Sequence, residues 1–161
     1  IGDKIVIKSK GVGLEFADHP SVKIKSCSPE LIDNLEVSTN DEGQLSVPVV
    51  AIVPPHLLGA GAGLNSEGGS LHIQTTDKAE LTKAGLDDLR LGDVVALQDY
   101  DSSWSHGYLR GAIGIGVIGQ TDSPRSGYGP GITLLMTSAE SAIEPKITEG
   151  VNLKTLFDLQ D

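Results

Sequence analysis

The segment 59–77, with the sequence GAGAGLNSEGGSLHIQTTD, constrains the fold more than any other part of the chain. It places five glycines between two apolar runs and ends in a polar cluster of His72, Gln74, Thr75, Thr76 and Asp77. Ordering a glycine costs more backbone entropy than ordering any other residue, so such a run opposes folding. We therefore expect the backbone here to adopt positive φ angles or to approach another group closely. Polar side chains at the exit of such a loop indicate a site for a ligand or a metal.

Length and composition favour a single β-rich domain that spans residues 1–161. The chain has 161 residues, with 20 glycines, 8 prolines and only 4% aromatic residues, which favours turns and short strands over long helices. Its formal net charge of −10 argues against nucleic acid and against an anionic membrane surface as partners, because both attract clustered Lys and Arg. No apolar run approaches the roughly 20 residues that span a bilayer.

The single cysteine, Cys27, excludes an internal disulfide and any metal site built from several cysteines. A lone cysteine without a local catalytic signature is most often a small buried residue. This composition is compatible with a reducing compartment, and we expect a cytoplasmic protein.

Short strands predominate in the pattern of apolar and turn residues. The expected strands are 21–25, 45–53, 71–74, 91–99, 112–118 and 132–137, and Pro48 indicates an edge or a bulge in the second of them. Helices are expected at 29–35, 78–84 and 151–159, the first capped by Ser28 and the second by Asp77. Helices this few and short exclude a doubly wound alternation. The expected fold is α+β and mostly β, a distorted β-barrel or sandwich with two or three short helices.

Residues 1–9 and 91–99 resemble each other, because each has an apolar residue, Gly-Asp and then a strand-like run. This similarity indicates two similar turn–strand units in one barrel or sandwich. The second copy follows a lead-in at 86–90, whereas the first begins at residue 1. We therefore expect the chain to be the C-terminal part of a longer two-domain protein, with the upstream domain as one of its partners.

Polar side chains that suit ligand binding fall in three places along the chain. The first is the glycine segment and its exit, the second lies between two expected strands at 99–110, and the third precedes the Gly-Pro-Gly turn at 129–131. The candidate ligand-binding residues are Asn65, Glu67, His72, Gln74, Asp101, His106, Asp122 and Tyr128. If the loops gather at one end of a barrel, all three places meet in its mouth, where ligand sites often form.

A metal site is the most specific version of the predicted ligand-binding site. Zinc binds histidine nitrogen and carboxylate oxygen, so His72 and Asp77 are the candidate ligands, joined by Asp101 or His106. No established ligand spacing such as HExxH is present. In the competing interpretation, His72 lies on the outer face of a strand and Asp77 only caps the next helix. The glycine runs are likewise open to two interpretations, tight backbone packing and contact with a ligand.

Four segments resemble the second half of a family known as domain of unknown function 4438: LHIQTTD (71–77), GLDDLRLGDVVALQD (85–99), RGAIGIGVIGQTDS (110–123) and GYGPGITLLMTS (127–138). The resemblance extends from Ile1 to about Pro145. It implies another domain upstream, and it carries over no catalytic residue because the family has no established activity. The Gly-x-Gly-Pro-Gly turn holds Tyr128 where the family leads us to expect histidine.

A second resemblance is to acetamidases and formamidases. Their metal-site region runs from a Val-Pro strand through a glycine turn to Leu-His, Gln and Asp, an order that VPVVAIVP, LLG and LHIQTTD follow here. The Gly-Asp-Gly-Glu that follows the Gln in that family is absent. We expect an uncharacterised domain that binds a small ligand beside its glycine-rich loops and forms a homo-oligomer. The alternative is a metal-dependent hydrolase of amide-like small molecules, with a divalent metal as its cofactor.

Overall fold

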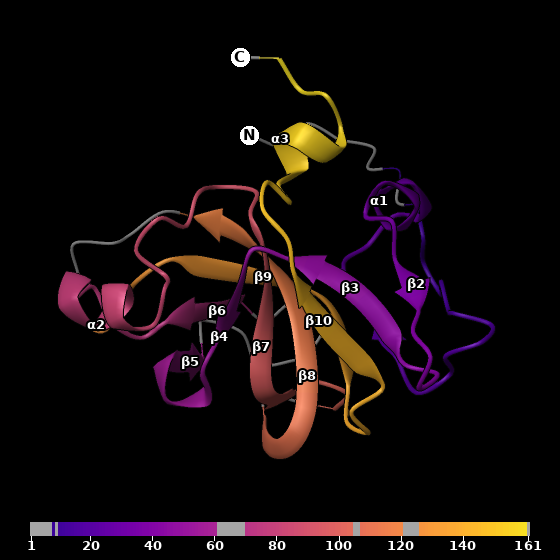
Figure 1. Cartoon of the computed structure of the whole chain (residues 1–161), viewed down its shortest axis with the longest axis horizontal. Coiled ribbons are helices and arrows are strands. Elements are labelled where there is room, and N and C mark those ends of the chain that lie inside the picture. The colour runs from indigo at the N-terminus through magenta and orange to yellow at the C-terminus, as the bar shows by residue number, and fades with distance from the viewer. Residues whose placement is uncertain (1–7, 9, 61–69, 105–106, 121–125, 161) are drawn as a thin grey trace, which may run out of the picture.

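The computed structural model describes residues 8, 10–60, 70–104, 107–120 and 126–160, which form two β-sheets and three short α-helices (Figure 1). The larger sheet contains β1 (Lys23–Ile24), β4 (Ala51–Val53), β5 (Leu58–Ala60), β6 (Ser70–Ile73), β7 (Val94–Asp101), β8 (Gly107–Gln120) and β9 (Gly131–Ser138). The smaller sheet contains β2 (Ser38–Thr39), β3 (Leu45–Val49) and β10 (Ile143–Ile147). The helices are α1 (Pro29–Asn34), α2 (Lys78–Lys83) and α3 (Leu153–Leu156), and a 3-10 turn, η1 (Pro55–Leu57), links β4 to β5. Within the described ranges, no helix has the length and apolar character needed to cross a membrane.

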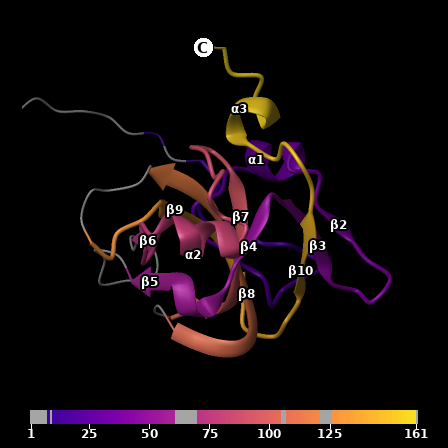
Figure 2. The ribbon, with the colours of Figure 1, turned by 60° about the vertical axis from the view of Figure 1, so that its left-hand side comes forward.

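The larger sheet curls almost into a barrel. Its order is β4-β7-β8-β9-β6-β5, with β1 added on β9, and only the β4–β7 pair among these neighbours is parallel. The two edge strands, β4 and β5, are consecutive in the chain, so η1 carries the backbone from one edge of the sheet to the other. Figures 1 and 2 show β5 beside the lower end of the β7–β8 hairpin. The chain itself therefore closes the barrel, without a ladder between β5 and β7 in the described residues.

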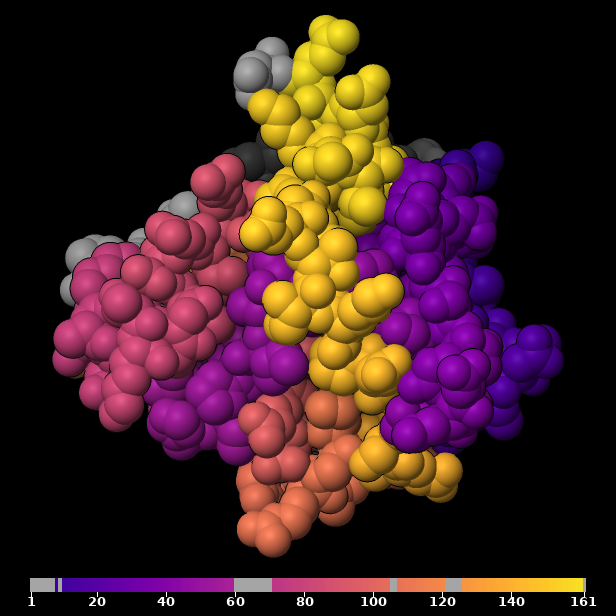
Figure 3. Space-filling model, in the orientation of Figure 1, coloured from indigo at the N-terminus to yellow at the C-terminus, as the bar shows by residue number. Residues whose placement is uncertain are grey.

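Strand β7 separates two hydrophobic cores. Val94 and Ala96 belong to the core that α1 and β3 also line, whereas Val95 and Leu97 face the interior of the barrel. This alternation is the two-residue period of a strand that is buried on both faces. In the space-filling view, the C-terminal segment from β10 to α3 crosses the surface between the α2 side and the β3 side (Figure 3).

The structure confirms the expected mostly β fold, with one nearly closed sheet and three short helices. Both predicted helix caps are present. The Ser28 hydroxyl accepts a hydrogen bond from Leu31 N at 3.2 Å, and Asp77 Oδ1 accepts one from Ala79 N at 2.9 Å. Such caps depend on a few adjacent residues, so local sequence is enough to predict them.

The expected strand at 45–53 is two strands in different sheets. Pro48 lies in β3, opposite Lys146 of the parallel strand β10. The chain then crosses to the larger sheet at Val50, whose N–H donates to Val94 O at 2.8 Å. The pairing partners lie far away in the sequence, which is why the residue pattern does not reveal the crossing. The expected helix at 151–159 is confined to α3. Most of residues 1–9, which resemble residues 91–99, lie outside the described residues.

Gly116 lies where β8 and β9 pack too closely for a side chain. A Cβ there would collide with Ile132 Cγ2 and lie 3.1 Å from Thr133 O, whereas a Cβ at Gly114 would contact only side-chain atoms, at 3.0 Å or more. We expect Gly116→Ala to lower the free energy of unfolding by about 2–3 kcal/mol, and the matched control Gly114→Ala to lower it by about 1 kcal/mol. Urea unfolding followed by circular dichroism measures both values. Equal losses would contradict this account of the packing.

Candidate functional site between β6 and the loop before β9

His72 lies in β6 on the face of the sheet that points away from the barrel core. Its neighbours Leu71 and Ile73 are buried in that core, and strand side chains alternate between the two faces. The residues paired with His72 on both sides are glycines, Gly59 of β5 and Gly131 of β9. The imidazole therefore has room beside the neighbouring backbone, since a Cβ on Gly59 would lie only 2.7 Å from His72 Nε2.

The ring of Tyr128 covers the ring of His72. The two rings stack with centroids 4.4 Å apart and planes inclined by 7°. His72 is only 7% exposed, whereas Tyr128, in the loop before β9, is 42% exposed. Nδ1 of His72 is buried and has no hydrogen-bond partner among the described residues. A buried polar atom without a partner costs about 1–3 kcal/mol, which matches or exceeds the roughly 0.5–1.5 kcal/mol of a stacked ring pair.

Gly129 lets the loop before β9 approach the exit of β6. Its N–H donates to Ile73 O at 2.6 Å, and Ile73 N donates to Pro130 O at 2.9 Å. A Cβ on Gly129 would lie 2.7 Å from Ile73 O and closer still to Thr75 O, so a side chain does not fit here. This glycine therefore serves tight backbone packing, and the packing places Tyr128 over His72.

The other polar residues at the exit of β6 hold the backbone in place. The Gln74 side chain donates from Nε2 to His56 O, and its backbone N–H donates to Leu57 O at 2.8 Å, which joins this exit to η1. Asp77 is exposed, and its carboxylate caps α2. In the described part of the chain, no three His, Cys, Asp or Glu side chains gather closely enough to hold a metal ion.

Asp101 lies toward the opposite end of β9 from His72. Its Oδ1 accepts hydrogen bonds from Ser103 Oγ at 2.7 Å and from Thr137 Oγ1 at 3.4 Å. Thr137 is near the end of β9, whereas His72 pairs with Gly131 at its start, and an extended strand spans roughly 20 Å between these two positions. The structure thus brings His72 of the glycine segment together with Tyr128 of the turn before β9, and it leaves Asp101 apart from both. Four further candidates lie outside the described residues: Asn65, Glu67, His106 and Asp122.

One buried carboxylate was not among the predicted site residues. Asp93 is 8% exposed, and it accepts hydrogen bonds from Arg90 N at 2.7 Å and from Asn152 Nδ2 at 2.8 Å. These bonds tie the turn before β7 to the residue that caps α3. The Gly-Asp pair that residues 91–99 share with residues 1–9 was the sequence feature that marked Asp93. In the structure, the Asp93 carboxylate holds the turn before β7 in place.

Comparison with models of protein families shows which family has sequences similar to this chain. A model described as "Domain of unknown function (DUF4438), C-terminal" matches residues 34–157, and the N-terminal model of the same family matches residues 1–33. The chain belongs to the DUF4438 family. The boundary between the two DUF4438 models falls within α1, where Leu31 and Leu35 pack into the same core. Residues matched by the N-terminal model therefore help to build this DUF4438 core.

The crystal structure of TM1086 is similar to this DUF4438 chain. The two share 36% sequence identity and superpose with a TM-score of 0.78 over 89% of this chain and 49% of TM1086. The chain thus spans about half the length of that relative. No curated protein matches the chain at a significant level.

Replacing Gly129 tests how the loop is placed over β6. We expect Gly129→Ala to lower the free energy of unfolding by about 1–3 kcal/mol, because the loop must lift from β6 and take Tyr128 with it. The imidazole NMR signals of His72 should then move toward the values of an exposed histidine.

Gly127→Asn is the matched control for this loop. Gly127 has a φ of 79° and nothing within 4 Å of an added Cβ, and asparagine tolerates that backbone conformation. We expect the control to keep the His72 signals in place. Unchanged signals in Gly129→Ala would mean that the loop does not hold the tyrosine.

Proposed function

We propose that this DUF4438 domain binds a small planar ligand beside its glycine-rich loops, at the stacked rings of His72 and Tyr128. The observation that carries the proposal is the buried Nδ1 of His72, which lacks a hydrogen-bond partner in the part of the chain that the structure describes. Native proteins rarely leave such an atom unpaired, and those that do often use it for binding or chemistry. A ligand that supplies the missing hydrogen bond would remove this cost.

The chemistry of the two rings defines the ligand class. A neutral imidazole has one nitrogen that donates and one that accepts a hydrogen bond. The stacked arrangement favours a flat ligand that lies beside His72 in the plane of the imidazole, where it can hydrogen-bond Nδ1, with its face against Tyr128. A planar amide combines an N–H donor, a carbonyl acceptor and a flat shape, so amide-like small molecules are the class that we propose.

A metal-dependent hydrolase of amide-like molecules is the second candidate function. The same free nitrogen suits zinc, which binds neutral imidazole through either ring nitrogen. Asp77 would be the second ligand, and it would have to leave its position as the cap of α2, where Oδ1 accepts from Ala79 N. Capping bonds of this kind contribute about 1 kcal/mol to stability. Binding zinc through Asp77 would lose this bond, whereas binding an amide at His72 would not.

Titrations with benzamide and with Zn²⁺ distinguish the two functions. We expect benzamide to shift the imidazole signals of His72 in NMR spectra, with a dissociation constant of about 1 mM, as is typical of a ligand this small. His72→Gln should weaken binding at least about tenfold, because the glutamine amide reaches the place of Nε2 but not that of Nδ1. His72→Asn places an amide near Nδ1 and should retain part of the affinity.

His56→Gln is the matched control, since His56 is an exposed histidine in the neighbouring turn η1. Its substitution should leave benzamide binding unchanged. Stoichiometric zinc that is lost in His72→Gln, without benzamide binding in the absence of metal, would favour the hydrolase. Failure of both probes to act through His72 would contradict both functions.

We also propose that the domain works in the cytoplasm, in a homo-oligomer whose chains carry an upstream domain. Support comes from TM1086, about twice as long as this chain, and from the free, buried thiol of Cys27. Burial raises the pKa of Cys27 to about 12, which keeps the thiol protonated and unreactive. Size-exclusion chromatography with light scattering should give a mass of at least two chains. A monomer at micromolar concentration would contradict the oligomer.

A further inference from the structure

A small pocket opens on the seam between β5 and the β7–β8 hairpin, where no ladder joins them in the described residues. Strand β4 pairs with β7 only as far as Leu97, so the end of β7 extends past its partner, and β5 lies beside the hairpin (Figure 1). The pocket lined by the two has a volume of about 150 Å³. Its main lining residues are Leu58, Gly59, Leu71, Asp99, Tyr100 and Tyr108.

The two sides of the pocket differ in character. The β5–β6 side is apolar, with Leu58 and the buried Leu71. The hairpin side is aromatic, because Tyr100 and Tyr108 are directly paired across β7 and β8. Burial raises the pKa of Tyr100 to about 12, so its hydroxyl stays neutral at physiological pH. The pocket thus offers apolar surface and aromatic rings to a ligand of modest size.

Among the described residues, Asp99 supplies the only carboxylate of this lining. It lies at the irregularity of β7, with a φ of 53°, and its Oδ1 accepts a hydrogen bond from Gly111 N at 2.8 Å. Arg110 is a cation near it: its hydrogen bond to Tyr108, and then electrostatic interactions with Tyr108 and Asp99, raise the pKa of the Arg110 guanidinium. Arg110 is fully exposed and is not among the lining residues, so water screens its charge more than it screens a charge inside the pocket.

We propose that this pocket binds a small organic ammonium ion, with its apolar body against Leu58 and Leu71 and its cationic head beside Asp99 and the tyrosine rings. Three observations support this class of ligand. A cavity of this volume holds a body of about the size of benzene. Tyrosine faces and a carboxylate both attract an ammonium group. The net charge of −10 draws cations toward the whole molecule.

This site is separate from the stack of His72 and Tyr128. A Cβ on Gly59 would point at His72, whereas the pocket lies along the edge of β5 that faces the hairpin. Neither His72 nor Tyr128 lines the pocket. Apart from Gly59, which borders both sites, the two proposals stand on different residues and can fail independently.

Three probes with nearly the same body and different charge test the proposal: benzylammonium, benzyl alcohol and benzoate. We expect NMR titration of the wild-type protein to show benzylammonium binding most tightly and benzoate most weakly, with shifts at Tyr100 and Tyr108. Raising the salt concentration should weaken only benzylammonium, because screening acts on the charge and not on the apolar body. Equal binding of all three probes, or no shift at either tyrosine, would overturn the proposal.

Two substitutions then move the affinity in opposite directions. Asp99→Asn keeps an acceptor for Gly111 N and a residue that tolerates positive φ, and it should weaken benzylammonium about fivefold while leaving benzyl alcohol unchanged. Arg110→Gln removes the competing cation and should tighten benzylammonium about twofold. The opposite order of the two variants would overturn the assignment of Asp99 to the cationic head.

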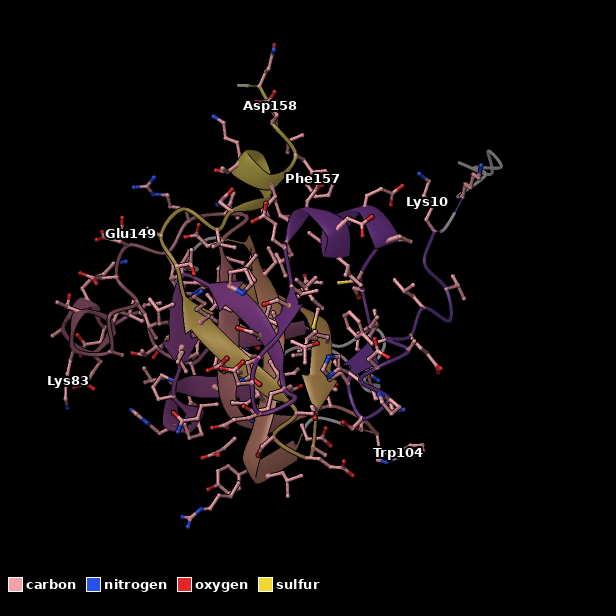
Figure 4. The ribbon with its side chains drawn as sticks, turned by 45° about the vertical axis from the view of Figure 1, so that its right-hand side comes forward. Lys10, Lys83, Trp104, Glu149, Phe157 and Asp158 are labelled. Atoms are coloured by element: carbon pink, nitrogen blue, oxygen red, sulfur yellow. The ribbon has the colours of Figure 1, made fainter. Side chains whose placement is uncertain are left out.

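Tyr108→Leu tests the aromatic wall, with Trp104→Leu as its matched control. Trp104 follows β7, is 92% exposed and projects away from the molecule in Figure 4, so it does not line the pocket. Tyr108→Leu should weaken benzylammonium about threefold or more, as expected for the loss of a cation–π contact. Equal effects of the two substitutions would show that the aromatic wall makes no contact with the ligand.

Discussion

The closure of the larger sheet by η1 is the constraint on which both candidate sites depend. Three residues of 3-10 turn carry the chain from β4 at one edge of the sheet to β5 at the other. A turn this short forces the two edges close together, yet β4 pairs with β7 only from Ala51 to Val53. The end of β7 is thus left facing β5 without a ladder between them in the described residues. The barrel is held closed by its covalent chain and by the core that packs inside it.

Strand β5 has a different environment on each of its sides because of this closure. On one side it pairs with β6, and Gly59 gives the His72 ring its space. On the other side it borders the seam and its pocket. The three-residue strand β5 therefore contributes to both proposed ligand-binding sites. Glycine fits at position 59 because the His72 ring and the Gln74 Cβ would lie 2.7 Å and 3.1 Å from a Cβ there.

Features set by adjacent residues were predictable from the sequence, and features set by distant partners were not. Ser28 and Asp77 could be assigned as caps because a cap needs only its own first turn. The division of 45–53 into β3 and β4 depends on β10 and β7, which lie elsewhere in the chain. No local pattern distinguishes one buried strand from two that change sheets.

The candidate site shows the same limit. His72 and Tyr128 were each singled out from the sequence, because each stands beside a glycine-rich run. Their stacking follows from the hydrogen bonds between Gly129 and Ile73, which periodicity does not encode. The expected meeting of Asp101 with them does not occur, since Asp101 is bound to Thr137 near the other end of β9. Strand order decides which loops share an end of a barrel, and it rests on long-range pairing.

The most direct test of the account is a measurement of nuclear Overhauser contacts between the rings of His72 and Tyr128 in the free protein. Rings with centroids 4.4 Å apart must give cross-peaks between the tyrosine ring protons and the imidazole protons. The account predicts these cross-peaks, together with upfield ring-current shifts on His72. Their absence, with Tyr128 at the chemical shifts of a free tyrosine, would show that the loop before β9 does not pack over β6.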